Sequence, residues 1–65
     1  MPRFRCICTV HLAAGAVETT TREVIGIEAN HERQAAELVV KAAKMRYKDF
    51  QAKVTKVTLD SIHRL

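Results

Sequence analysis

The sequence predicts an α+β fold with the element order ββαβ, in which one helix packs on one face of a three-stranded antiparallel sheet. Three observations lead to this fold class. Residues 30–48 carry the apolar period of an amphipathic helix. The segments on either side of this stretch are rich in β-branched residues, which favour strands. A single helix among strands has only a sheet on which to bury its apolar stripe.

The helix is expected over residues 30–48, with its end between Met45 and Lys48. Asn30 is the expected N-cap, because its side-chain oxygen can accept a hydrogen bond from a backbone N–H of the first turn. Glu32 suits the positive end of the helix dipole. The apolar side is shallow because most of its residues are small: Ala35, Ala36, Leu38, Val39, Val40, Ala42, Ala43 and Tyr47.

The first strand is expected over residues 3–12, where apolar and polar side chains alternate with Ile7 as the exception. Its inward side would consist of Phe4, Cys6, Cys8, Val10 and Leu12. A short link over residues 13–16, with Gly15 available for a positive φ, predicts a hairpin to the next strand. Because this strand is the most apolar, we expect it at the centre of the sheet.

The second strand is expected over residues 17–29, with Ile25, Ile27 and Ala29 facing the core. Glu23 would then also point inward. This conflict predicts a bulge or frayed backbone upstream, with Gly26 as one candidate site.

The third strand is expected over residues 53–59, after a link over residues 50–52. Its inward side chains would be Thr55, Val57 and Leu59. Residues 60–65 are expected to form a tail in which Ile62 and Leu65 can still pack. Placing this strand beside the first makes every neighbouring pair antiparallel and gives the order 2-1-3. The alternative order is 1-2-3 with one parallel pair.

The sheet face opposite the helix is the candidate interaction surface. It is expected to be basic and rich in threonine, with an apolar centre formed by Ile7, Val24 and Val54. An alternative interpretation is that these three residues serve only sheet propensity. The candidate binding residues are Arg3, Arg5, Ile7, Thr9, His11, Arg22, Val24, Val54 and Lys56. A second basic face lies along the helix and consists of Arg33, Lys41, Lys44 and Lys48.

Length and composition bound the function. The chain of 65 residues is expected to form one domain, residues 1–65. A domain of this size can gain core by forming a homodimer, and the alternative is a monomer. The net charge of +4 permits contact with phosphates or with an acidic protein surface. The two cysteines, Cys6 and Cys8, are expected to be reduced core thiols of a cytoplasmic protein. Thr9 and His11 interrupt the apolar run that a signal peptide needs, and no run is long enough to span a membrane.

Catalytic and cofactor motifs are not evident, so we expect a non-enzymatic protein without a cofactor. A metal site from both cysteines and one histidine (His11, His31 or His63) is disfavoured, since Cys-x-Cys is not the usual ligand spacing. Cys8 and His11 are expected on opposite sides of their strand, which argues against a nucleophile and its base. The only glycines are Gly15 and Gly26, too few for a phosphate-binding loop.

The expected function is that of a small basic binding module that contacts nucleic acid or a nucleic-acid-handling complex. The open sheet face carries no aromatic residue, which disfavours an RNA reader that stacks bases. The alternative is a protein–protein interaction or inhibitor protein that acts through the open sheet face or as a dimer. In size, charge and layout the chain resembles small accessory proteins of phages and other mobile elements, including anti-CRISPR inhibitors. That resemblance implies an inhibitor of nucleic-acid-handling complexes and concerns the overall plan rather than a motif.

Overall fold

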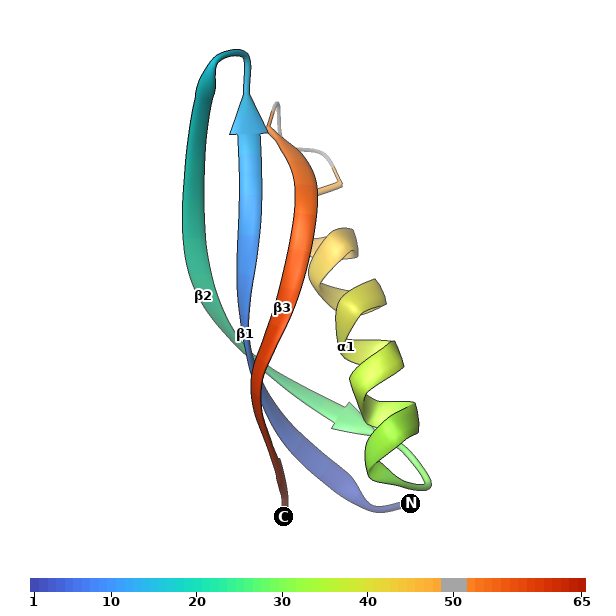
Figure 1. The fold of residues 1–65 in the computed structure, drawn as a ribbon. Helices are drawn as coiled ribbons and strands as arrows, with labels where there is room; N and C mark the ends of the chain where they lie inside the picture. The colour runs from blue at the N-terminus through green and yellow to red at the C-terminus, as the bar shows by residue number, and fades with distance from the viewer. Residues whose placement is uncertain (49–51) are drawn as a thin grey trace.

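The computed structural model describes residues 1–48 and 52–65. Its elements are β1 (Arg3–Ala14), β2 (Val17–Glu28), α1 (Glu32–Arg46) and β3 (Lys53–Arg64). The strands form one antiparallel sheet in the order β2-β1-β3, and α1 lies across one face of it (Figure 1). The predicted ββαβ fold with the order 2-1-3 is therefore confirmed, and the order 1-2-3 is wrong. Asp49 and the first two residues of the expected link, Phe50 and Gln51, lie outside the described residues.

The hairpin of β1 and β2 has one unbroken register, from the pair Arg3 and Glu28 to the pair Ala14 and Val17. Its two-residue loop begins with Gly15, whose φ of 63° matches the first central position of a type I′ or II′ turn. The bulge expected near Gly26 is absent from this ladder. Gly26 instead pairs directly with Arg5, and the inward position of Glu23 is accommodated by hydrogen bonding.

The third strand is longer than expected, because the predicted tail continues the ladder as far as Arg64. Ile62 pairs with Cys6, so the end of β3 extends along most of β1. The pairing of β1 with β3 shifts register twice, between Ile7 and Cys8 and between His11 and Leu12. Each shift leaves one additional residue on β3, namely Asp60 and Thr55. Each is a β-bulge, which bends the strand locally.

The bulge at Thr55 corrects two expectations. Val54, expected on the open face, pairs with Leu12 and packs against the core cluster. Thr55, expected to point inward, is exposed, and its hydroxyl donates a hydrogen bond of 3.3 Å to the carbonyl oxygen of His11. The physical reason is that one additional residue shifts the alternation of side chains by one position.

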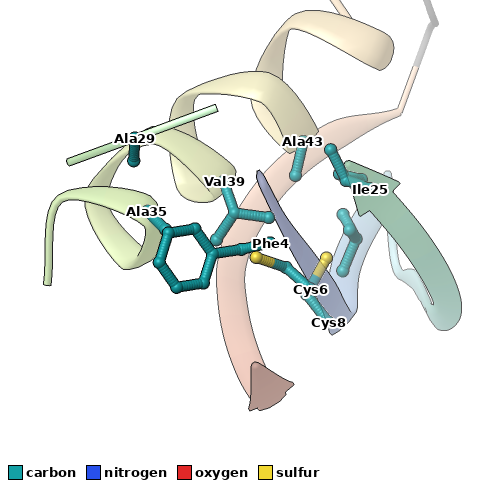
Figure 2. Packing of buried hydrophobic residues seen from close by; sticks show 9 residues of the cluster. Phe4, Cys6, Cys8, Ile25, Ala29, Ala35, Val39 and Ala43 are labelled. Atoms are coloured by element: carbon teal, nitrogen blue, oxygen red, sulfur yellow. The ribbon is translucent and has the colours of Figure 1, made fainter. Parts of the chain in front are cut away.

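The core lies between α1 and the sheet (Figure 2). Its buried residues are Phe4, Cys6, Cys8, Val10, Ile25, Ala29, Ala35, Val39 and Ala43. The three residues that α1 contributes, Ala35, Val39 and Ala43, are four apart and form one narrow stripe. Two of them are alanines, so the helix can lie close to β1. The inward positions predicted for the first strand are confirmed, with Leu12 only partly buried.

The helix begins two residues later than expected, and its N-cap is His31 rather than Asn30. The Nδ1 atom of His31 accepts a hydrogen bond of 3.2 Å from the backbone N–H of Gln34. In return, the side-chain oxygen of Gln34 accepts a hydrogen bond of 2.6 Å from the backbone N–H of Asn30. This reciprocal arrangement resembles a capping box, with histidine in the place of serine or threonine. The helix ends at Arg46, within the expected range.

Candidate interface on the open sheet face

The face of the sheet that α1 leaves uncovered is called here the open face (Figure 1). Phe4, Cys6, Cys8 and Val10 are buried on the helix side, so the residues between them point to the other side. The strand register therefore gives the open face a grid of side chains in cross-strand rows. From Arg3 toward the hairpin, the rows are Arg3–Glu28, His63–Arg5–Gly26, Ser61–Ile7–Val24, Thr58–Thr9–Arg22, Lys56–His11–Thr20 and Lys53–Ala13–Glu18.

The grid brings together eight of the predicted site residues: Arg3, Arg5, Ile7, Thr9, His11, Arg22, Val24 and Lys56. Val54 is excluded from it by the bulge at Thr55. The apolar centre is therefore smaller than expected and consists of the cross-strand pair Ile7 and Val24. Val24 is 57% exposed, and Ile7 is half-buried.

The charges of the open face are mixed but predominantly positive. Arg3 forms a long ion pair with Glu28, 4.0 Å from Nε to Oε1, with both side chains about two-thirds exposed. Such an exposed pair contributes little to stability. Within the described part of the chain, Arg5, Arg22 and Lys56 form no ion pair. These three side chains therefore carry positive charge that is not matched by a direct carboxylate contact.

Several residues that were not among the candidates also belong to the open face: Glu18, Thr20, Glu28, Lys53, Thr58, Asp60, Ser61 and His63. Asp60 is one of the two bulge residues of β3, and its Oδ2 accepts a hydrogen bond of 2.6 Å from the hydroxyl of Thr9. Asp60 was missed because residues 60–65 were expected to form a tail. The apolar side chains at 57, 59 and 62 are the signal in the sequence that the strand continues.

A hollow of about 230 Å³ lies at the hairpin end of the sheet. It is lined by His11, Leu12, Glu18, Thr19, Thr20 and Thr55. Its polar side chains offer hydroxyl, imidazole and carboxylate groups to a partner. They include no phenylalanine, tyrosine or tryptophan, and among the described residues Phe4 is buried under α1 and Tyr47 lies at the end of that helix. The open face therefore has hydrogen-bonding and charged groups but, among the described residues, no phenylalanine or tyrosine on which a base could stack.

The second basic face follows the exposed side of α1 and contains Arg33, Lys41, Lys44 and Lys48. Helical spacing puts Glu37 one turn from both Arg33 and Lys41, within the same row. This row lies on the opposite side of the molecule from the open face, so the two basic surfaces cannot contact one flat partner together (Figure 1).

The two thiols are buried and unreactive in this fold. Cys6 and Cys8 are free cysteines with no exposed surface. Burial raises the pKa of the Cys6 thiol, and the neighbouring Cys8 adds to the effect. Burial also raises the pKa of the Cys8 thiol, with a further contribution from Glu23 and Asp60. Both thiols therefore stay protonated at neutral pH, a form that is neither nucleophile nor metal ligand. The described residues contain no cluster of three or more His, Cys, Asp or Glu side chains suited to a metal ion.

Within the described chain, α1 is both too short and too polar to cross a lipid bilayer. No protein-family model matches the sequence, and searches of curated proteins and of solved structures found no match.

Proposed function

We propose that this protein binds the phosphate backbone of nucleic acid through its open face. The observation that carries the proposal is the set of three exposed cations, Arg5, Arg22 and Lys56, that lack an ion-pair partner among the described residues. They surround the apolar pair Ile7 and Val24 on the face that the helix does not cover.

The spacing of these cations suits a contact that extends over several phosphates. Arg22 lies four residues along β2 from the partner of Arg5, which corresponds to about 14 Å along the sheet. Lys56 lies one row beyond Arg22 and two strands away, about 12 Å from it. Since successive charges of one duplex strand are about 3.4 Å apart along the axis, these distances span roughly four nucleotides.

The chemistry of the face favours contact with the backbone over reading of bases. Arginine and lysine side chains bind phosphate oxygens, and threonine hydroxyls can donate further hydrogen bonds to them. Base stacking is strongest on large aromatic rings, and no described phenylalanine or tyrosine lies on the open face, where His11 and His63 supply only small imidazole rings. The acidic side chains of Glu18, Glu28 and Asp60 on the same face reduce the net attraction. The proposed binding is therefore weak, independent of sequence and sensitive to salt.

Fluorescence anisotropy with a labelled 20-base-pair DNA duplex and a labelled single-stranded RNA tests the proposal. Neutralising three phosphates predicts a slope of about −2.7 for log K against log salt on the duplex. Arg5→Ala and Lys56→Ala should each reduce the slope by about 1. Lys41→Ala on α1 is the matched control and should leave binding unchanged. Absence of binding at 20 mM salt, or loss of binding only in the control, contradicts the proposal.

A second candidate function follows from the exposure of Val24. An exposed valine that pairs with Ile7 on a basic surface also suits an acidic protein partner with a small apolar contact. This candidate matches the inhibitor role implied by the resemblance to phage accessory proteins. Affinity capture from lysate treated with nuclease distinguishes the two functions, because only a protein partner survives the treatment. Val24→Asp should abolish that capture, whereas Met45→Asp, an exposed apolar residue on α1, should not.

A further inference from the structure

The two edges of the sheet differ in how well they are protected against pairing with another strand. The β3 edge is interrupted by two bulges, at Thr55 and Asp60. Bulges of this kind are a common means of preventing edge-to-edge association. The β2 edge has neither a bulge nor a proline, and its register against β1 is unbroken over its full length. Of the two edges, β2 is therefore the one at which a further strand can pair through backbone hydrogen bonds.

The hairpin turn determines which backbone groups of β2 face outward. In a two-residue hairpin loop, the residues that flank the turn, here Ala14 and Val17, form a hydrogen-bonded pair. Hydrogen-bonded and non-hydrogen-bonded pairs alternate along an antiparallel ladder. Glu18, Thr20 and Arg22 therefore direct their N–H and C=O groups away from β1, toward the free edge. Their side chains lie on the open face.

We infer that two copies of this chain pair through the Val17–Glu23 half of β2, antiparallel and centred on Thr20, to form a homodimer with one continuous sheet. In this register Thr20 pairs with Thr20 of the second copy. Glu18 pairs with Arg22 of the second copy, and by symmetry Arg22 pairs with Glu18 of the second copy. Each of these residues has outward backbone groups, so the register forms a complete hydrogen-bonded ladder with two cross-strand ion pairs.

Charge favours this register because it is the one, among two-fold registers of this segment, that places Glu18 opposite Arg22, whereas registers centred on Thr19 or Thr21 form no ion pair. Pairing centred on Arg22 would bring two arginines face to face. Pairing centred on Glu23 would oppose two glutamates and would also place Glu18 opposite Glu28. Like charges directly opposite each other on a sheet are destabilising. Pairing centred on Ile25 would place Arg22 opposite Glu28, which already contacts Arg3.

The position of the helix favours the same half of β2. The end of β2 bends toward the N-terminal end of α1 (Figure 1). Ile25, in this part of β2, is buried. Glu23 itself points to the helix side, where Tyr47 and Arg46 contact it. The segment from Val17 to Arg22 precedes the buried position of Ile25 and is mostly exposed. A two-fold axis through Thr20 places the two helices on the same face at opposite ends of the sheet, so they do not collide.

The dimer joins the two open faces into one surface. It does not depend on nucleic-acid binding. It gives Arg22 a carboxylate partner, and Arg5, Lys53 and Lys56 then remain as open-face cations without an ion pair to any described residue. The test is therefore made without nucleic acid. Sedimentation equilibrium should give a mass of twice 7.3 kDa for the unmodified chain.

Thr20→Pro is the first variant, because proline removes an N–H that points to the free edge and leaves the ladder with β1 intact. It should give a monomer with unchanged circular dichroism. Thr20→Ala keeps the N–H and is the matched control, which should remain a dimer.

Charge reversal tests the register. E18R and R22E should each be monomeric at concentrations where the unmodified chain is dimeric, because each variant opposes like charges. An equimolar mixture of E18R and R22E should recover a heterodimer, since every cross-strand pair is then opposite in charge. The double variant E18R/R22E should recover the homodimer.

A monomeric unmodified chain at 1 mM overturns the inference. So does a dimer that persists in Thr20→Pro, or a mixture of E18R and R22E that stays monomeric. Arg5→Ala and Lys56→Ala, which test the nucleic-acid proposal, should not change the mass. Failure of one proposal is therefore distinguishable from failure of the other.

Discussion

The phenolic oxygen of Tyr47 lies 3.0 Å from Oε1 of Glu23 and donates a hydrogen bond to it, which joins the end of α1 to the middle of β2. Arg46 Nη1 lies 3.5 Å from the same carboxylate oxygen. Glu23 therefore tolerates its place on the helix side of the sheet because it accepts from a hydroxyl and contacts a guanidinium. A polar group that would be costly if it were buried alone becomes the anchor of the helix end.

The first prediction concerns the ionisation of Tyr47, the only tyrosine in a chain without tryptophan. Burial raises the pKa of Tyr47 above its ordinary value, and the hydrogen bond to Glu23 adds to this shift. Absorbance at 295 nm should therefore show a higher midpoint for the folded protein than for the protein in 6 M guanidinium chloride. Glu23→Gln should lower the folded midpoint. A folded midpoint at or below the denatured one contradicts the contact.

The same shift predicts how stability depends on pH. A phenol whose pKa is raised by folding binds its proton more tightly in the native state. Its contribution is fully present below the pKa of the unfolded chain, near 10, and is lost as pH rises through the higher folded value. Urea unfolding at pH 8 and pH 11 should show this loss, and Tyr47→Phe should reduce it.

The second prediction concerns the energy of this contact. Tyr47→Phe should destabilise the fold by about 1–2 kcal/mol, since it leaves the partly buried carboxylate without its hydroxyl donor. In a double-mutant cycle with Glu23→Gln, the two changes should be non-additive by about 0.5 kcal/mol or more. Urea denaturation followed by circular dichroism provides the measurement. Strictly additive effects would mean that the two side chains do not interact.

The third prediction concerns the thiols. Cys6 and Cys8 have no exposed surface, and their raised pKa values keep them protonated. A disulfide reagent such as dithionitrobenzoate at pH 8 should therefore react slowly with the native protein and rapidly in denaturant, with both thiols titrating. Cys8→Ser should cost about 1–3 kcal/mol, because a hydroxyl replaces a thiol in an apolar site. Rapid reaction of either thiol in the native protein would show that the reagent reaches the core without unfolding, and would contradict the prediction.

The fourth prediction concerns the end of β3. Ile62 pairs with Cys6 and packs against the core, so Ile62→Ala should destabilise the fold by about 1–2 kcal/mol. Leu65→Ala is the matched control, since Leu65 is 63% exposed, and it should change stability by less than about 0.5 kcal/mol. Equal effects of the two variants would argue for a tail rather than a strand.

The fifth prediction concerns the helix N-cap. His31→Ala should destabilise the fold by about 0.5–2 kcal/mol, because the N–H of Gln34 loses its acceptor. His31→Asp should restore most of this loss. Asn30→Ala should have a smaller effect, since Asn30 contributes its backbone N–H to the contact with Gln34. Thermal denaturation of the three variants orders the effects, and a larger loss for Asn30→Ala than for His31→Ala would assign the cap to Asn30.

Much of the open face could be predicted, because β1 alternates over most of its length. Once Phe4, Cys6 and Cys8 are assigned to the core, the opposite positions of Arg5 and Thr9 follow from strand geometry alone. The alternation in β3 is interrupted, with apolar residues at 54 and 57 that are three apart. The bulge at Thr55 resolves this spacing, and only the pairing partner reveals it.

The sequence by itself determined the element order, the central place of β1 and the apolar stripe of α1, because these depend on local period and on the need to bury apolar surface. Tertiary structure alone decided the side on which Val54 lies and the partial burial of Glu23 beside Tyr47. Each of these depends on which distant backbone or side-chain group is available as a partner. Which partner is available depends on how α1 and β3 pack against β1. The local sequence pattern therefore does not predict it.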